Sequence, residues 1–273
     1  MLTELVHIET DGIPLDGVLY RPEGSTRGAV QLMHGNTMNF YVGPPRFLPP
    51  LLTQRGWTCL AYNRRGHDVL SNRDSRRLEG GAYQTIAQAS ADNEYARSWL
   101  ADLGFPSPVV VGHSNGGTLG VAHVASHPDT PALVLLSAHR GGVDLMRRLA
   151  ERGLMAGDDY EAITSRALRL VEEGRPDTLM LVPGWWYVIS AGTYVEYLRR
   201  CPDVLELAPS IDVPTLYLVG DSEPEDLYPA RAFRERAPGP VTVEVVGDCD
   251  HYYTRQEDAV AASVARFLDS LGT

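Results

Sequence analysis

The chain has 273 residues, enough for one large α/β domain with a substantial buried core, so no second domain is required. Asp and Glu outnumber the basic residues by 35 to 24, and the formal net charge of −11 would repel a nucleic acid, so we expect no nucleic-acid partner. All the basic residues are arginines. The absence of lysine excludes Schiff-base chemistry, lysine-linked pyridoxal phosphate and a lysine-bearing phosphate loop.

The cysteines and the apolar segments indicate where the protein resides. Cys59, Cys201 and Cys249 are scattered and odd in number, which suits a reducing compartment better than a disulfide framework. The first residues alternate apolar and polar side chains instead of forming a basic stretch and an apolar run, so we expect no signal peptide. No apolar segment is long enough to span a bilayer. We therefore expect a cytoplasmic protein without a membrane partner.

The first part of the chain favours strands. Leu5 to Glu9 and Ile13 to Tyr20 alternate on either side of the turn signal Asp11-Gly12, which indicates a β-hairpin. Short apolar runs at residues 28–33 and 57–62 suit strands that are covered on both faces.

Helices and strands then alternate. A proline-rich stretch precedes a short helix predicted near residues 51–56, where a glycine supplies the stop signal. Apolar residues at helical spacing predict a helix over 83–103, which is followed by a strand at 108–112, a helix at 115–126 and a strand at 132–136. Such alternation indicates a largely parallel sheet with helices on both faces.

The alternation stops at residues 140–207, where amphipathic helical stretches follow one another. These helices could simply belong to the outer layer of the sheet. Because we recognise no strand among them, and because an insertion here would lie over the ends of the strands, we interpret them as a helical lid.

The sheet resumes after this segment. Strands are predicted at 214–219 and 241–246, before a final helix from Asp258 to Leu271. The predicted architecture is therefore one α/β core, residues 1–139 and 208–273, with a mostly parallel, doubly wound sheet and the lid inserted between its two parts.

The most informative motif is Gly112-His113-Ser114-Asn115-Gly116. It matches the nucleophile elbow, in which a strand turns so sharply into a helix that small residues must flank the exposed serine. An apolar β-branched strand precedes the motif and a predicted helix follows it. We therefore predict that Ser114 is a nucleophile.

A serine hydroxyl is a weak nucleophile unless a neutral imidazole takes its proton. His251 follows the last predicted strand in a loop that could return over the sheet, so we predict that it is the general base. His113 is too near Ser114 in sequence to reach its hydroxyl. We expect surface or packing roles for His123 and His127, which fall in the following helix.

A carboxylate should hold the imidazole in the correct tautomer. The loop after strand 214–219 offers Asp221, Glu223, Glu225 and Asp226, and the residues themselves leave the choice among them open.

Acyl transfer also needs hydrogen-bond donors aimed at the oxyanion. The N–H of Asn115, directly after the nucleophile, is one candidate. The second should come from the loop after an early strand, where His34-Gly35-Asn36-Thr37 lies, and we assign it to Asn36; an ordinary glycine-containing turn is the alternative.

These segments, in this order, resemble the α/β-hydrolase superfamily over nearly the whole chain. The resemblance is carried by the elbow, extended to Gly117, and by the following shorter segments: His34-Gly35, Arg65-Gly66-His67, Gly220-Asp221-Ser222-Glu223 and Asp250-His251.

The resemblance implies an α/β-hydrolase fold and the chain order Ser, acid, His. It places the acid three residues after the glycine that ends its strand, at Glu223, with Asp226 and Asp221 as alternates. Relatives often carry Asp-x-Arg-Gly-x-Gly-x-Ser after the fourth strand, whereas this chain departs from that pattern at residues 63–71, which puts the local loop shape in doubt but not catalysis. Haloalkane dehalogenases and soluble epoxide hydrolases of the superfamily carry Asp at the nucleophile, so Ser114 argues against both.

We therefore expect a serine hydrolase that cleaves an ester, thioester or lactone of a small molecule, with no metal and no cofactor. The alternatives are an acyltransferase, a carbon–carbon bond hydrolase, or a non-catalytic ligand-binding protein on the same fold. Trp185, Trp186 and Phe40 could line an apolar substrate pocket, or could pack the lid onto the sheet. A small-molecule substrate is the expected partner, and a monomer or homodimer the expected state.

Overall fold

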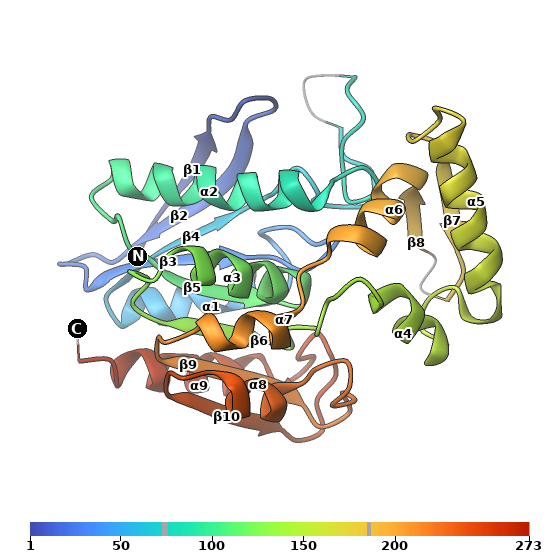
Figure 1. The fold of residues 1–273 in the computed structure, drawn as a ribbon. Coiled ribbons are helices and arrows are strands. Elements are labelled where there is room, and N and C mark those ends of the chain that lie inside the picture. Colours follow the sequence, from blue (N-terminus) through green and yellow to red (C-terminus); the bar gives the residue numbers. More distant parts are fainter. Residues whose placement is uncertain (73–75, 185–186, 273) are drawn as a thin grey trace.

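The computed structural model describes residues 1–72, 76–184 and 187–272. Within these residues, eight strands form one sheet in the order β1-β2-β4-β3-β5-β6-β9-β10 (Figure 1). β2 pairs antiparallel with β1 and with β4, and the other neighbouring pairs are parallel. The strands are β1 (Leu2–Ile8), β2 (Leu15–Arg21), β3 (Gly28–Met33), β4 (Trp57–Tyr62), β5 (Val109–His113), β6 (Leu133–Leu136), β9 (Thr215–Gly220) and β10 (Val241–Val246).

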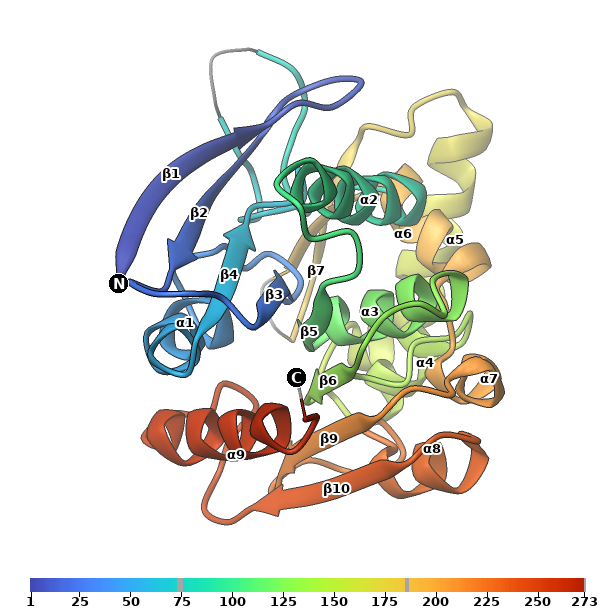
Figure 2. The ribbon, with the colours of Figure 1, turned by 90° about the vertical axis from the view of Figure 1, so that its left-hand side faces the viewer.

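Helices cover both faces of this sheet, as the view in Figure 2 shows. On one face α1 packs against α9, and on the other face α2, α3, α7 and α8 follow one another in contact. The predicted mostly parallel, doubly wound α/β sheet is thus confirmed. The helices are α1 (Pro44–Gln54), α2 (Ile86–Asp102), α3 (Asn115–Ser126), α7 (Val204–Leu207), α8 (Ala230–Arg236) and α9 (Glu257–Asp269), with a 3-10 turn at Ala208–Ser210.

The central strands read as continuous apolar runs because both of their faces are buried. All five residues of β5 and all four of β6 are buried, and β-branched valines fill much of β5. Parallel strands covered by helices on two sides have this composition. The site described below begins where β5 ends.

α1 begins earlier than the helix predicted near residues 51–56. It starts at Pro44, and the first helical positions tolerate proline because their N–H groups have no partner inside the helix. Two further prolines, beginning with Pro49, lie inside the helix and weaken it. Leu48 and Leu52 lie one turn apart and are fully buried against the sheet. Their burial contributes about 1.5–3 kcal/mol each, which offsets the poor intrinsic propensity.

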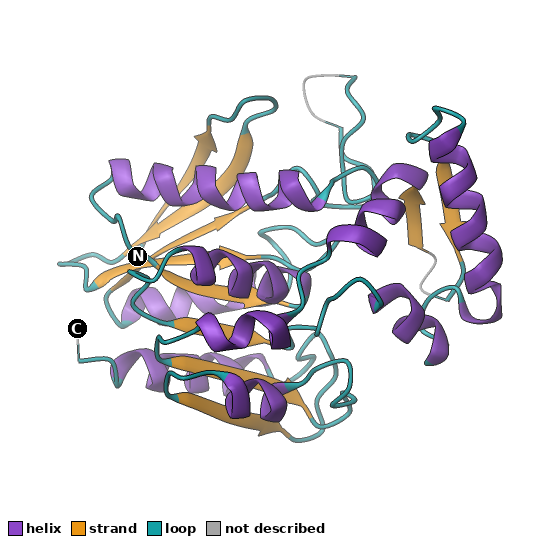
Figure 3. Ribbon diagram, in the orientation of Figure 1, coloured by secondary structure: helices purple, strands orange, loops and turns teal. Residues whose placement is uncertain are grey.

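The segment predicted as a helical lid is not wholly helical. It also contains a two-stranded antiparallel sheet (Figure 3). In β7, Met180 and Val182 are buried whereas Leu179 and Leu181 are more exposed, and this alternation with period two is typical of a strand. The elements of the segment are α4 (Leu145–Glu151), a 3-10 turn (Gly157–Asp159), α5 (Tyr160–Glu172), β7 (Leu179–Val182), β8 (Tyr187–Ser190) and α6 (Ala191–Arg200).

The segment lies at one end of the sheet, opposite the two chain termini in Figure 1. α7, which the predicted boundary includes in the segment, instead contacts α3 and α8 in the outer layer of the sheet. None of the described helices is long and apolar enough to cross a membrane.

Candidate active site

Ser114 lies at the sharp turn between β5 and α3. Its backbone has φ 54° and ψ −122°, a conformation that is strained for a residue with a side chain. Neighbouring backbone approaches too closely for larger residues, because a Cβ atom on Gly116 would lie 2.2 Å from the carbonyl oxygen of Met33. A Cβ on Gly112 would lie 2.4 Å from the carbonyl oxygen of Gly116. The predicted elbow is therefore present, with the steric reason for its glycines.

Three side chains from distant parts of the sequence form a chain of hydrogen bonds at this turn. The Nε2 atom of His251 lies 3.0 Å from the Oγ atom of Ser114, and its Nδ1 atom lies 2.6 Å from Oε1 of Glu223. An ionised carboxylate can only accept, so Nδ1 carries a hydrogen and the neutral ring leaves Nε2 free to accept one. This arrangement can remove the proton from the Ser114 hydroxyl.

The other carboxylates of the acid loop have different partners. Asp221 accepts hydrogen bonds from the backbone N–H groups of Cys249 (3.1 Å) and Asp248 (2.9 Å), and these bonds lower the pKa of its carboxyl. It thereby ties the acid loop to the loop that carries His251. Asp226 forms an ion pair with Arg152, whose Nε lies 3.2 Å from Oδ2. Of the three proposed acids, the structure brings Glu223 to His251.

Two further donors hold the Glu223 carboxylate, whose side chain is only 4% exposed. The Ser137 hydroxyl donates to Oε2 over 2.5 Å, and the backbone N–H of Gly220 donates to the same oxygen over 2.8 Å. The Tyr253 hydroxyl lies 2.6 Å from Oγ of Ser137 and extends the network into the core. Sequence reasoning missed Ser137, although its position directly after β6, at the carboxyl end of a strand, is a signal for a site residue.

We expect Ser137→Ala to lower kcat about tenfold with little change in KM. The substitution removes a hydrogen bond to a charged acceptor, worth about 1.5–3 kcal/mol, and loosens the group that orients His251 without touching the substrate cavity. Steady-state kinetics measures both constants. Ser222→Ala, an exposed hydroxyl in the acid loop, is the control and should change kcat less than twofold; equal losses in both variants would contradict the role of Ser137.

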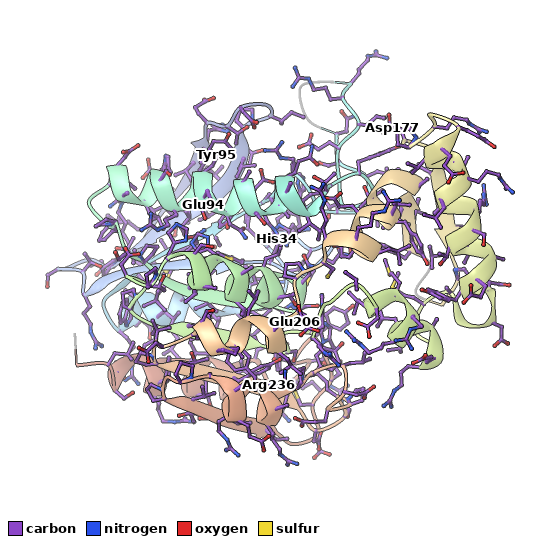
Figure 4. All side chains as sticks on the ribbon, in the orientation of Figure 1. His34, Glu94, Tyr95, Asp177, Glu206 and Arg236 are labelled. Carbon is purple, nitrogen blue, oxygen red and sulfur yellow. The ribbon has the colours of Figure 1, made fainter. Side chains whose placement is uncertain are left out.

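Two buried histidines hold the backbone around the site. Nε2–H of His113 donates to the carbonyl oxygen of His251 over 2.9 Å, and burial, with the nearby His251 ring, lowers the pKa of His113 to about 3. His34, labelled near the middle of the molecule in Figure 4, donates from Nδ1 to the Gly35 carbonyl (2.7 Å) and accepts the Arg64 N–H at Nε2 (3.0 Å). Burial lowers the pKa of His34 well below its ordinary value. Both rings are therefore neutral, and they position the loops before Asn36 and around His251.

A cavity of about 550 Å³ opens beside Ser114. Asn36 and Asn115, the two residues predicted to stabilise an oxyanion, both line it. The side-chain amide of Asn36 donates to the Tyr187 hydroxyl over 2.7 Å, which links the loop after β3 to β8. The other lining residues are mainly apolar: His139, Leu145, Met146, Leu149, Met155, Tyr187, Tyr197, Leu227 and Tyr228.

The cavity wall differs from the one that the sequence predicts. Phe40 is not one of its described lining residues; its ring packs edge-on against Tyr41 and onto the core beneath α1 and α9. Trp185 and Trp186 lie outside the described residues. The helix that contributes most to the apolar wall is instead α4, whose helical spacing gave no sign that one face lines a cavity.

The chain matches the Alpha/beta hydrolase family over residues 32–263. Its fold is similar to Est1E from Butyrivibrio proteoclasticus with ferulic acid bound (20% identity over 97% of this chain and 98% of that chain, TM-score 0.72). It is also similar to a soluble variant of monoglyceride lipase from Saccharomyces cerevisiae in complex with a substrate analog (14% identity, 99% and 96%, TM-score 0.71).

A third similar structure is dienelactone hydrolase from Anabaena variabilis (18% identity, 98% of this chain and 97% of that chain, TM-score 0.60). At these identities the likeness shows the fold alone. No match was found among curated proteins.

Proposed function

Because this chain belongs to the α/β-hydrolase family, to which it matches over residues 32–263, we propose that it is a serine hydrolase that cleaves an ester bond through an acyl-enzyme. The observation that carries the proposal is the hydrogen-bond chain Ser114–His251–Glu223 at the edge of an apolar cavity. A thioester or a lactone presents the same carbonyl chemistry and belongs to the same substrate class.

In the first half of the reaction Ser114 is the nucleophile. Its Oγ attacks the ester carbonyl carbon while its proton moves to Nε2 of His251, 3.0 Å away. Glu223 holds Nδ1–H and stabilises the positive charge that develops on the ring. His251 then delivers the proton to the leaving alcohol as the bond between the carbonyl carbon and the alkoxy oxygen breaks.

The negative charge on the carbonyl oxygen needs donors in the same cavity. The backbone N–H of Asn115 is the first of α3, and the first N–H groups of a helix have no partner inside the helix. We assign the second donor to the backbone N–H of Asn36, across the cavity on the loop after β3. Water then attacks the acyl-enzyme with His251 as its base, which releases the acid and restores Ser114.

The cavity favours an acyl group that is apolar. Leu145, Met146 and Leu149 of α4 form one side of it, so we propose that the inserted segment, residues 140–207, acts as a lid whose side chains select the substrate. The buried Tyr187 hydroxyl offers a neutral hydrogen-bonding group, because burial raises its pKa to about 12.

The test is activity on p-nitrophenyl esters of increasing acyl length, together with labelling by a fluorophosphonate. We expect stoichiometric labelling of Ser114 and release of p-nitrophenol from short to medium acyl chains. An ester of ferulic acid belongs in the panel, because a protein of similar fold holds that acid. Labelling without ester hydrolysis would direct the search to acyl transfer or carbon–carbon cleavage; no labelling, with tight ligand binding, would support a binding protein.

We expect Leu149→Phe to shift acyl-chain preference toward shorter chains. The larger ring fills part of the cavity beside α4, so kcat/KM for the longest accepted ester should fall about tenfold. A fall of this size is what an apolar pocket typically shows when a substrate is one or two methylene groups too long. The acetate ester should change less than twofold. Leu168→Phe, on α5 and not among the described lining residues, is the matched control. An equal loss on all chain lengths would contradict a role of Leu149 in selection.

The cysteines bear on the cellular location. Cys59, Cys201 and Cys249 are all free and buried. Since three unpaired thiols suit a reducing compartment, we propose a cytoplasmic location.

A further inference from the structure

A second cluster of chemically competent side chains lies outside the active site. Glu94 comes from α2, His123 lies in the last turn of α3, and His127 is the residue that directly follows that helix. One nitrogen of each imidazole and the carboxylate of Glu94 all lie within 4.8 Å of one another. Figure 4 labels Glu94 on α2, beside α3. We call these three residues the Glu94 cluster.

The hydrogen bonds define which nitrogen atoms face the carboxylate. Nδ1 of His127 lies 2.8 Å from the carbonyl oxygen of His123, so this nitrogen carries a hydrogen and donates it. In the neutral ring, Nε2 of His127 then presents a lone pair to Oε2 of Glu94, 3.2 Å away. Two acceptors at that distance repel each other unless a positive charge lies between them, either a proton on the ring or a metal ion.

The second histidine completes a donor set. Nδ1 of His123 lies 2.8 Å from Oε1 of Glu94, and the two imidazole rings are stacked with their centroids 4.4 Å apart. Donor atoms around a tetrahedral zinc ion are about 3.3 Å apart, given bond lengths of about 2.0–2.1 Å. The two nitrogen–oxygen separations, 2.8 Å to Oε1 and 3.2 Å to Oε2 of Glu94, are close to that value, so small side-chain rotations would admit the ion.

We propose that the Glu94 cluster binds a divalent transition metal, with Zn²⁺ as the best fit, through two imidazole nitrogens and one carboxylate. Two nitrogens and an oxygen suit Zn²⁺, whereas Mg²⁺ and Ca²⁺ prefer oxygen ligands alone. The bond from His127 Nδ1–H to a backbone carbonyl is the outer contact that orients most metal-binding histidines. The proposal adds metal binding to the surface or packing roles predicted for His123 and His127.

Exposure and position indicate what such an ion would do. The side chain of His123 is 3% exposed, that of His127 19% and that of Glu94 45%, so the ion would keep an open side for water. His123 lies nine residues after Ser114, about 13 Å along α3, which separates the metal from the catalytic groups. The ion would join α2 to α3, the helix that begins at the nucleophile, and so stabilise the fold.

The experiment is titration of chelator-treated protein with Zn²⁺ by isothermal calorimetry at pH 8, where unperturbed imidazoles are neutral. We expect one ion per chain with Kd of about 10 µM or below, and a rise in Tm of about 5 °C or more at one hundred times Kd. Glu94→Gln and His127→Gln should each weaken binding at least tenfold. Co²⁺ should give the visible absorption of a tetrahedral complex, lost in both variants.

The matched control is His7→Gln. His7 faces Asp16 at 2.7 Å on the exposed β1–β2 hairpin, a histidine–carboxylate pair outside the Glu94 cluster, and its replacement should leave the affinity unchanged. Zinc bound at His251 would persist in all three variants. Failure to bind Zn²⁺ at 100 µM, or equal affinity in the wild type and Glu94→Gln, overturns the proposal. Glu94→Gln is nearly isosteric, so it decides the matter even if His127→Gln folds poorly.

Discussion

Ser114→Ala is expected to lower kcat for p-nitrophenyl ester hydrolysis about 10⁴-fold or more, with little change in KM. The substitution removes the atom that would form the acyl bond and leaves His251, Glu223 and the cavity in place. Alanine has the same Cβ atom as serine, so the substitution leaves the steric strain of the elbow backbone unchanged. Steady-state kinetics gives the loss, and mass spectrometry should show that the variant no longer forms the fluorophosphonate adduct.

The control for this variant is Ser126→Ala, which removes an exposed hydroxyl at the far end of α3 and should retain full activity. Circular dichroism and Tm establish that both variants are folded. If Ser114→Ala retained a tenth of the wild-type kcat, nucleophilic catalysis by Ser114 would be refuted, and the ester hydrolysis would have to proceed by direct attack of water.

Glu223→Gln is expected to lower kcat about 10³- to 10⁴-fold. The amide N–H of the substituted side chain can donate to Nδ1 of His251. The ring hydrogen then lies on Nε2, so this nitrogen can no longer accept the Ser114 proton. The change is nearly isosteric, so Ser137 and the Gly220 N–H keep an oxygen to which they can donate. The measurement is kcat on the same ester, with Tm as a check on folding.

Two other carboxamides test whether the acid is assigned correctly. Asp226→Asn breaks only an exposed ion pair with Arg152 and should change kcat less than threefold. Asp221→Asn weakens the tie to the backbone of Cys249 and should cost less than tenfold. A loss in Asp226→Asn larger than that in Glu223→Gln would transfer the acid's role to Asp226.

The features that the sequence predicts well depend on local chemistry. The elbow around Ser114 is recognisable because a Cβ atom at Gly112 or Gly116 would lie within 2.4 Å of a backbone oxygen, so only glycine fits at either position. β3, β4 and β10 have the predicted bounds, because short apolar runs between turn signals leave few alternatives. These segments indicate that the chain belongs to the α/β-hydrolase superfamily, and the family match confirms this.

Other features depend on contacts that no sequence window contains. Proline content argues against a helix over Pro44–Gln54, yet burial of Leu48 and Leu52 against the sheet stabilises one there. The alternation in β7 is only four residues long, too short to stand out among amphipathic helices until it pairs with β8. Phe40 is partly buried and packs against the core instead of lining the cavity. An aromatic side chain suits either place, so its residue type alone does not decide between them.

The choice of the acid shows most clearly which features follow from the sequence and which from the tertiary structure. By itself the sequence predicted Ser114 as the nucleophile, His251 as the base, a mostly parallel sheet and a loop with several carboxylates, because steric limits and hydrophobic periodicity act over a few residues. The residues alone left the acid open and the resemblance placed it at Glu223; the tertiary structure brings Glu223 to His251, and Ser137 and the Gly220 N–H orient its carboxylate. The tertiary structure alone placed Glu94 of α2 beside His123 of α3 and His127, which follows that helix. The positions of Glu223 and Glu94 both depend on hydrogen bonds between segments that are far apart in the chain, and the order of the residues does not reveal such hydrogen bonds.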